Sequence, residues 1–371
     1  MKITPYQVEG SIDYEKICSE FGIKQITPEL KEKIKQMTNA DSHFLRRGIF
    51  FAQRDLKWCL EEYEKGNKFF LYTGCGPSGP IHLGHLGTWR FAKWLQDVFD
   101  VEMWFQFTDD EKFLFKNLEY DQVQHWLREN MLDVIALGFD PKKTHFLINT
   151  AHASIIYPEA IKVAKKITTS TVKGAFGFTD SNNIGSIFYT AMQTTPVFLP
   201  NVLRNENRPC LVPLGIDQDP HFRISRDVVE KLGFHKPAII HAKMMTPLTG
   251  PEGKMSSSDA QKAILTTDDP ATVKKKINKY AFSGGQDTLE KHRELGGNPD
   301  IDTAYQWLRY FEEDDAVLED LAAKYRCGEL LSGELKQKVI DAINSFLAKH
   351  QEARKEAESK LQEFIFHPGK L

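Results

Sequence analysis

Apolar and polar residues show two different periodicities along the first two thirds of this chain. Short runs of strand-forming residues predict three strands, at residues 68–73, 101–107 and 144–148. Between these runs, apolar residues recur every three or four positions, which predicts one helix after residue 82 and another over residues 121–137. Strands that alternate with helices in this way form a parallel sheet with helices on both faces.

The alternation of strands and helices continues to about residue 241 and then stops. Residues 211–214 and 238–241 predict two more strands, separated by a helix over residues 222–232. After these, strand signals stop, and the apolar spacing predicts mostly helices, at residues 273–280, 305–311, 317–325 and 333–364. The sequence therefore predicts an α/β protein in which a Rossmann-type parallel sheet precedes a helical C-terminal domain.

These patterns divide the chain into three parts. Residues 1–45 mix turn formers with short apolar groups and a charged helical stretch near residues 28–37, so we expect an N-terminal extension. Residues 46–265 form the expected Rossmann-type domain, and residues 266–371 form the helical domain.

Composition narrows the class of protein. A length of 371 residues, with 41% hydrophobic and 27% charged residues, is ordinary for a large domain with a smaller one attached. The chain contains no apolar run of about 18 residues, so we expect no membrane contact and a cytoplasmic location. Its five cysteines form no Cys-x-x-Cys pair, which argues against a disulfide framework or a zinc site. With a net charge of −3, any nucleic-acid binding must come from local patches.

The first candidate site is the sequence His82, Leu83, Gly84, His85, which lies where a predicted strand feeds a helix. The backbone N–H groups and the dipole of a helix N-terminus favour an anion, and two imidazoles add donors for phosphate oxygens. Gly84 has no Cβ, so a flat purine can approach its backbone closely. The alternative is a pair of histidines at a helix start with no ligand, because short motifs occur by chance.

A second candidate lies far along the chain, in a loop rich in glycine. Lys254, Met255, Ser256 and Ser258 follow Gly250 and Gly253, so the lysine can reach a departing pyrophosphate while the serines add donors. A lysine flanked by glycines is more often a solvated loop charge. Its pairing with the histidine motif is what favours a phosphate site.

Between these two motifs, Gly215 and Asp217 follow the predicted strand 211–214. Ligands of open α/β sheets bind at the carboxyl ends of strands, and a carboxylate there can accept from both hydroxyls of a ribose. Asp217 can also be a helix N-cap or part of an Asx turn ahead of Pro220. The neighbouring motifs favour the ribose interpretation.

Taken in order, these three motifs resemble those of the class I aminoacyl-tRNA synthetases. Five further segments resemble the tryptophanyl enzymes of eukaryotes and archaea, at residues 72–77, 106–112, 177–181, 191–193 and 216–220. The resemblance covers the chain from about residue 12 onward. The combination of motifs is far more specific than any one of them.

The resemblance implies a site for tryptophan. Tyr72 and Gln106 would hold the indole N–H, while Glu111, Gln193 and Gln218 would hold the amino group. Elementary chemistry agrees, because an ammonium group requires a carboxylate and neutral acceptors. The extra area of an indole over a smaller ring is worth only about 1–2 kcal/mol, so buried polar partners must carry the discrimination.

The resemblance also implies a site for ATP in complex with Mg²⁺. It implies no residue of this chain as a ligand of the metal ion. The residues that it assigns to ATP are Thr73, Gly74, His82, Gly84, His85, Lys112, Gly215, Asp217, Lys254, Met255 and Ser256. Those that it assigns to catalysis are His82, His85, Lys254, Ser256 and Ser258. One departure is Ser257, where many class I enzymes have a second loop lysine, and Lys112 is our candidate to replace it.

The implied reaction joins L-tryptophan to tRNA(Trp) through tryptophanyl-adenylate, with the C-terminal domain reading the anticodon in a homodimer. A tyrosyl-tRNA synthetase is the nearest alternative, since it shares the fold and the order of motifs. A nucleotidylyltransferase shares the histidine motif but lacks the lysine loop. A silent binding protein would not need His82, His85, Asp217 and Lys254.

Overall fold

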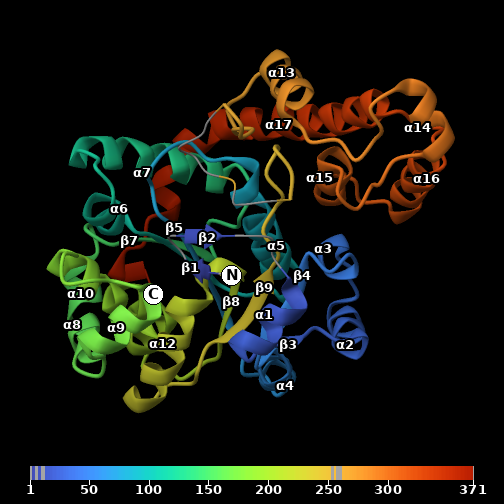
Figure 1. Ribbon diagram of the computed structural model, residues 1–371. Coiled ribbons are helices and arrows are strands. Elements are labelled where there is room, and N and C mark those ends of the chain that lie inside the picture. Colours follow the sequence, from blue (N-terminus) through green and yellow to red (C-terminus); the bar gives the residue numbers. More distant parts are fainter. Residues whose placement is uncertain (1, 5–6, 10–12, 252–254, 256–260, 371) are drawn as a thin grey trace.

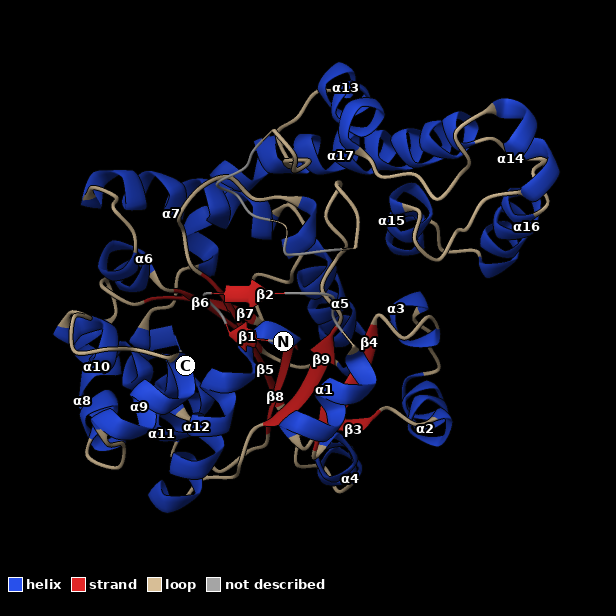
Figure 2. Cartoon of the chain, viewed as in Figure 1, coloured by secondary structure: helices blue, strands red, loops and turns tan. Residues whose placement is uncertain are grey.

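A seven-stranded sheet forms the centre of the molecule, in the order β3-β4-β9-β8-β5-β6-β7. The computed structural model describes residues 2–4, 7–9, 13–251, 255 and 261–370 (Figure 1). Figure 2 shows the strands between two groups of helices, so both faces of the sheet are covered. The predicted α/β class is confirmed.

Five neighbouring strands of this sheet are parallel. They are β5 (Phe70–Cys75), β6 (Met103–Phe107), β7 (Thr144–Ile148), β8 (Cys210–Gly215) and β9 (Ala238–Ala242). All five lie within about two residues of the positions predicted from the sequence. The chain leaves β5 toward β6 and β7 on one side and returns to β8 and β9 on the other, so the strand order reverses between β5 and β8.

Two antiparallel strands at one edge were not predicted. β4 (Phe50–Arg54) pairs with β9, and β3 (Lys24–Gln25) pairs with β4. The sheet is therefore mixed, and the part of the chain that we expected to be an extension contributes its outermost strand. Strands β1 (Lys2–Thr4) and β2 (Gln7–Glu9) form a separate two-stranded sheet.

Among the described residues before Arg47, the structure has three helices: α1 (Tyr14–Phe21), α2 (Pro28–Thr38) and α3 (His43–Arg46). The helix predicted near residues 28–37 is thus confirmed as α2. It begins with Pro28 after the N-cap Thr27, whose side chain accepts from the Leu30 N–H. A proline at the first position and a threonine cap are both typical of helix starts.

Alternation along the strands separates two apolar cores, one on each face of the sheet. Phe69 and Leu71 pack on one face with helix α5 (Leu83–Phe99), whereas Phe70 and Tyr72 pack on the other. This second face is covered by helices from the middle of the chain. They include α8 (Ala153–Ala164), α9 (Thr169–Phe176), α10 (Ile184–Thr194), α11 (Leu199–Arg204) and α12 (Asp219–Val229).

Three further helices complete this part of the chain: α4 (Leu56–Glu64), α6 (Asp109–Phe115) and α7 (Tyr120–Ile135). Helix α6 follows β6 directly and packs against α7 and α10. It therefore carries the residues after the carboxyl end of β6 to the second face of the sheet.

After β9 the described chain is mostly helical, as predicted. The helices are α13 (Pro270–Tyr280), α14 (Leu289–Leu295), α15 (Thr303–Phe311), α16 (Asp315–Arg326) and α17 (Ser332–Phe364). Figure 1 shows them gathered along α17, away from α8, α9 and α12.

Helix α17 connects this helical part to the sheet. It packs against α7, α13 and α15, and just beyond its end the Phe366 N–H donates to the Phe146 carbonyl at 3.1 Å. Its buried residues Leu335, Val339, Ile343 and Leu347 recur every four positions, which places them on one face. In the described part of the chain no helix combines the length and the apolar character that crossing a bilayer requires.

Candidate active site

A cavity of about 300 Å³ opens at the carboxyl ends of β5 and β8, where the strand order reverses. This is the position at which open α/β sheets bind ligands. Most of the residues predicted for the site line this cavity: Tyr72, Thr73, Gly74, His82, Gly84, His85, Glu111, Lys112, Gln193, Gly215, Asp217, Gln218 and Met255. Lys254, Ser256 and Ser258 lie outside the described residues.

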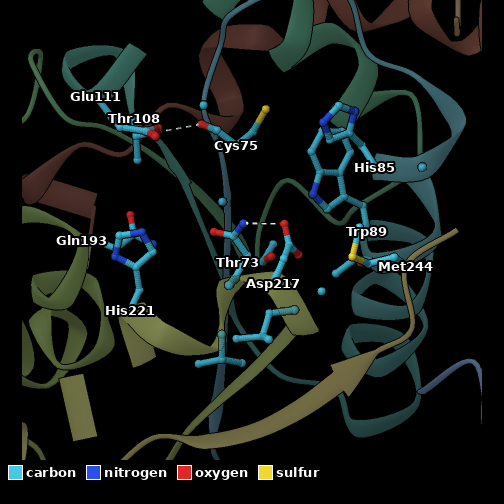
Figure 3. Close-up of a pocket in the computed structure, with 18 of the residues that line it drawn as sticks. Thr73, Cys75, His85, Trp89, Thr108, Glu111, Gln193, Asp217, His221 and Met244 are labelled. Atoms are coloured by element: carbon cyan, nitrogen blue, oxygen red, sulfur yellow. Dashed lines mark hydrogen bonds between the residues drawn. The ribbon is translucent and has the colours of Figure 1, made fainter. Parts of the chain in front are cut away.

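Two groups of residues face each other across the cavity. Figure 3 shows Glu111, Gln193 and His221 on one side and His85, Trp89 and Met244 on the other, with Asp217 between them. We call the set Tyr72, Gln106, Glu111, Gln193 and His221 the glutamine side. The set His82, Gly84, His85, Gly215 and Asp217 is the glycine side.

Hydrogen bonds connect three residues of the glutamine side, Tyr72, Gln106 and Gln193. The Tyr72 hydroxyl donates to Gln106 Oε1 at 2.5 Å, and Gln193 Nε2 donates to the Tyr72 oxygen at 3.1 Å. Gln106 is fully buried behind Tyr72 and does not line the cavity. Burial raises the pKa of Tyr72 well above its usual value, so this hydroxyl keeps its proton.

Glu111 supplies the carboxylate of the glutamine side. Its Oε2 accepts from the Thr108 hydroxyl at 2.9 Å, and its Oε1 accepts from Lys112 Nζ at 2.8 Å. Gly76 makes this arrangement possible, because a Cβ at that position would lie 1.9 Å from Lys112 Cε and 2.7 Å from Glu111 Oε2. The carboxylate is therefore held in place by two donors while it faces the cavity.

His221 completes the glutamine side and was not predicted. It lies in the first turn of α12, directly after Pro220, and is only 4% exposed. Burial lowers the pKa of His221 to about 4, so the imidazole is neutral at pH 7. A neutral ring adds no positive charge to compete with a bound ammonium group.

On the glycine side, two aromatic stacks form the cavity wall. His82 is the N-cap residue of α5, and its ring stacks on that of His85 with centroids 3.9 Å apart. The His85 ring in turn stacks on Trp89 at 5.6 Å. A Cβ on Gly84 would lie 3.0 Å from two ring atoms of His82, so this side is already closely packed at that position.

Asp217 lies in a short 3-10 helix over Ile216–Gln218, immediately after β8. It is 6% exposed, and Gln218 Nε2 donates to its Oδ2 at 3.1 Å. The N-cap of α12 is Gln218 and not Asp217, so the N-cap alternative is wrong. A Cβ on Gly215 would lie 2.7 Å from Asp217 Oδ1, which explains the glycine.

Known proteins are similar to this chain over most of its length. Residues 64–348 match the family described as tRNA synthetases class I (W and Y). The chain belongs to this family. It is therefore a ligase, and the family inferred from the sequence motifs is confirmed.

Individual relatives of this class I tRNA synthetase carry tryptophan in their names. The chain is 50% identical to tryptophan–tRNA ligase of Sulfolobus acidocaldarius, over 98% of this chain and 95% of that one. It is 45% identical to the cytoplasmic tryptophan–tRNA ligase of Saccharomyces cerevisiae, over 100% of this chain and 89% of that one. The tryptophan-bound structure of the Encephalitozoon cuniculi tryptophanyl-tRNA synthetase superimposes with a TM-score of 0.89, at 36% identity, covering 98% and 100%.

Several residues on the cavity wall of this tRNA synthetase were missed in the sequence. They are Cys75, Gly76, Ser78, Thr88, Trp89, Thr108, Tyr189, Val212, Leu214, His221, Phe222, Lys243, Met244 and Met245. Some carried a usable signal, since Lys243, Met244 and Met245 follow the predicted strand 238–241 at its carboxyl end. Trp89 lies one helical turn after His85, on the same face of α5.

Proposed function

We propose that this tRNA synthetase activates L-tryptophan with Mg-ATP to give tryptophanyl-adenylate and pyrophosphate, and then transfers the tryptophanyl group to the 3′-terminal ribose of tRNA(Trp) with release of AMP. The observation that carries the proposal is a single cavity with two unlike sides. The glutamine side offers acceptors for a cationic, N–H-bearing ligand. The glycine side offers close backbone approach and a carboxylate for a nucleotide.

In this proposal, tryptophan binds on the glutamine side. We assign recognition of the indole N–H to Tyr72 and Gln106, since the Tyr72 oxygen lies at the cavity and Gln106 Oε1 accepts from its hydroxyl directly behind it. Glu111 and Gln193, together with Gln218, hold the ammonium group. The carboxylate of Glu111 supplies the strongest of these bonds, because hydrogen bonds between two charged groups are stronger than neutral ones.

ATP binds on the glycine side. Thr73 and Gly74 lie near the carboxyl end of β5, Gly84 lies in the first turn of α5, and Gly215 ends β8, so three backbone segments converge on the nucleotide. Asp217 accepts from the ribose hydroxyls, and Met255, whose sulfur would lie 3.4 Å from a Cβ on Gly84, borders the same space. Lys254 and Ser256 complete the phosphate contacts.

The chemistry requires positioning more than proton transfer. A carboxylate oxygen of tryptophan attacks the α-phosphorus in line, and the bond from that phosphorus to the bridging oxygen breaks, so pyrophosphate leaves with the electron pair. The attacking carboxylate is already ionised and needs no general base. His82, His85, Lys254, Ser256 and Ser258 stabilise the charge on the phosphates.

Magnesium enters this scheme as part of the substrate. Mg²⁺ keeps several water ligands and is commonly held by substrate phosphates together with few protein oxygens. The described residues include no cluster of three or more His, Cys, Asp or Glu side chains arranged for a metal ion. When bound, the ion neutralises phosphate charge, and we assign it no protein ligand.

The remaining parts of the proposal concern assembly. The helical part, residues 266–371, would read the anticodon, while residues 46–265 would carry both reactions and residues 1–45 would extend them. We place the enzyme in the cytoplasm, as the name of the yeast relative has it, and as a homodimer.

The deciding experiment is tryptophan-dependent exchange of labelled pyrophosphate into ATP, with tyrosine and phenylalanine as matched amino acids. We expect exchange with tryptophan and little with the other two. Exchange with tyrosine alone would identify a tyrosine enzyme of the same family. No exchange with any of the three would reject a catalytic function.

Lys112 needs a separate test, because its ammonium already bonds Glu111. We expect Lys112→Ala to lower the rate of exchange by roughly tenfold, the worth of one phosphate contact. Lys254→Ala should abolish exchange. An unchanged rate in the Lys112 variant would show that Lys112 is not part of the ATP site. Lys112 would then not replace the second loop lysine that is missing at Ser257.

A further inference from the structure

We propose that Asn149, held by Asp110, is a positioning residue that fixes the direction of the hydrogen bond between Tyr72 and Gln106. It thereby favours an amino acid whose ring carries an N–H donor. Neither Asn149 nor Asp110 lines the cavity. The inference deepens the proposed function and rests on it.

A continuous chain of hydrogen bonds leads from Asp110 to the cavity. Asn149 Nδ2 donates to Asp110 Oδ1 at 2.7 Å, and Gln106 Nε2 donates to Asn149 Oδ1 at 2.8 Å. The chain continues with the 2.5 Å bond from Tyr72 to Gln106. Asn149 is 1% exposed and follows the end of β7, while Asp110 lies in the first turn of α6.

The direction of every bond in this chain follows from its first member. Asp110 Oδ1 also accepts from the Glu111 backbone N–H at 2.8 Å, so it is an acceptor. Burial raises the pKa of Asp110 to about 6, which leaves the carboxylate ionised at pH 8. An ionised carboxylate cannot donate, so Asn149 must turn its amide nitrogen toward Asp110 and its oxygen toward Gln106.

The same reasoning passes to the next side chain. Gln106 must present its nitrogen to Asn149, and that nitrogen also lies 3.5 Å from the Met192 carbonyl, which can only accept. The Gln106 oxygen is then left for Tyr72, whose single hydroxyl hydrogen is used in that bond. The Tyr72 oxygen also accepts from Gln193 Nε2 at 3.1 Å, so it offers a ligand one remaining lone pair and no hydrogen.

This arrangement selects for a donor on the ligand. An indole N–H can donate to the remaining lone pair of the Tyr72 oxygen, whereas a ring of the same shape without N–H leaves that lone pair without a donor. A site built to hydrogen-bond a ligand group rejects the analogue that lacks it, because buried polar groups then lose their partners. Without Asn149, only the longer 3.5 Å contact with the Met192 carbonyl holds the Gln106 nitrogen, so the amide can turn over. The Tyr72 hydroxyl hydrogen is then released from Gln106 and can point to the Gln193 carbonyl, 3.3 Å away, or to the ligand.

The test compares tryptophan with 3-benzothienylalanine, which replaces the indole N–H by sulfur, in the pyrophosphate exchange assay at pH 8. We expect Asn149→Leu to lower the ratio of kcat/KM between the two amino acids by roughly tenfold. The change should come mainly from a higher KM for tryptophan with a similar kcat, because the indole contact is made equally in ground and transition states. If the Asn149→Leu variant does not fold, Asn149→Ser is used in its place. A serine hydroxyl can donate or accept, so it does not fix the direction of the hydrogen bond with Gln106.

The rescue variant is the exchange Asp110→Asn with Asn149→Asp. Its carboxylate at position 149 can only accept from Gln106, so the selectivity of the original enzyme should return to within about threefold. Asn201→Leu is the matched control, because Asn201 is a buried amide that bonds Arg208 away from the cavity. It should leave the selectivity unchanged.

Two results would overturn the inference: an unchanged ratio in both the Asn149→Leu and Asn149→Ser variants, or an exchanged pair as unselective as they are. Both results can be distinguished from a failure of the proposed function, since that is judged by the unaltered enzyme with tryptophan. If the unaltered enzyme does not exchange pyrophosphate with tryptophan, the proposed function itself fails.

Discussion

The two sides of the cavity are built from the same sheet by different means. The glutamine side consists of long polar side chains that already bond one another, as Tyr72 does with Gln106 and Gln193. The glycine side consists of stacked rings and of backbone that lacks a Cβ at Gly84 and Gly215.

This difference teaches how one cavity handles two kinds of ligand. A small set of fixed donors and acceptors can distinguish one amino acid from another, because each mismatch leaves a buried group unpaired. A nucleotide that is the same in every reaction needs close approach and charge more than discrimination. If this division is correct, changes on the two sides should alter the KM values of different substrates.

The largest effect should follow Glu111→Gln on the glutamine side. The variant keeps the size of the side chain but loses the charge that pairs with the ammonium group, so KM for tryptophan should rise by roughly 10² while KM for ATP stays similar. Steady-state pyrophosphate exchange measures both. Glu159→Gln is the matched control, since Glu159 is a buried carboxylate that pairs with Lys162 outside the cavity. If KM for tryptophan and KM for ATP rise equally, the two sides of the cavity do not bind different substrates.

The next effect concerns pH and the neutral His221. Because burial lowers its pKa from 6.5 to about 4, its contribution to stability is present above pH 6.5 and is lost as pH falls toward 4. Between neutral pH and pH 5, the free energy of unfolding should fall by about 2 kcal/mol from this group. Urea titrations at the two pH values measure it, and His221→Gln should remove that part of the pH dependence. An equal dependence in the variant would show that other groups are responsible.

A smaller effect, on KM for ATP more than on KM for tryptophan, should follow Asp217→Asn. Losing the carboxylate weakens the bonds proposed to the ribose hydroxyls, so KM for ATP should rise by roughly tenfold and KM for tryptophan by much less. Replacing ATP by 2′-deoxy-ATP should already cost the unaltered enzyme part of this affinity. If the variant and the unaltered enzyme lose equally with 2′-deoxy-ATP, Asp217 does not bind that hydroxyl.

The smallest effect should follow Gly84→Ala. The added methyl group would lie 3.0 Å from the His82 ring and must displace it slightly, so KM for ATP should rise by roughly threefold to tenfold. Gly174→Ala is the control, since Gly174 lies within α9 with open space around it. That change should leave activity unaltered and raise the free energy of unfolding by about 0.5–1 kcal/mol. If KM for ATP is the same in the Gly84→Ala and Gly174→Ala variants, close approach of ATP to the Gly84 backbone does not contribute to binding.

Local patterns in the sequence determined much of this protein. Runs of apolar residues located all five parallel strands, because alternation and strand propensity are properties of neighbouring residues. The rule that ligands bind at strand ends brought His82, His85 and Asp217 to one site, and the cavity lies there. The motifs also identified the family without any structural information.

Pairing between distant segments was decided only by the tertiary structure. Strand β3 has only two residues and β4 ends in the polar residues Gln53 and Arg54, so neither produces a run of apolar residues that stands out. Their places in the sheet depend on the pairing of β4 with β9 and of β3 with β4. The position of Gln106 behind Tyr72, and its bond to Asn149, join residues 34 and 43 positions apart. Sequence spacing carries no information about such contacts, because they depend on how the three neighbouring strands β5, β6 and β7 pack together. The residue types at the site were therefore set by the sequence, whereas the direction in which each hydrogen bond runs was set by the fold.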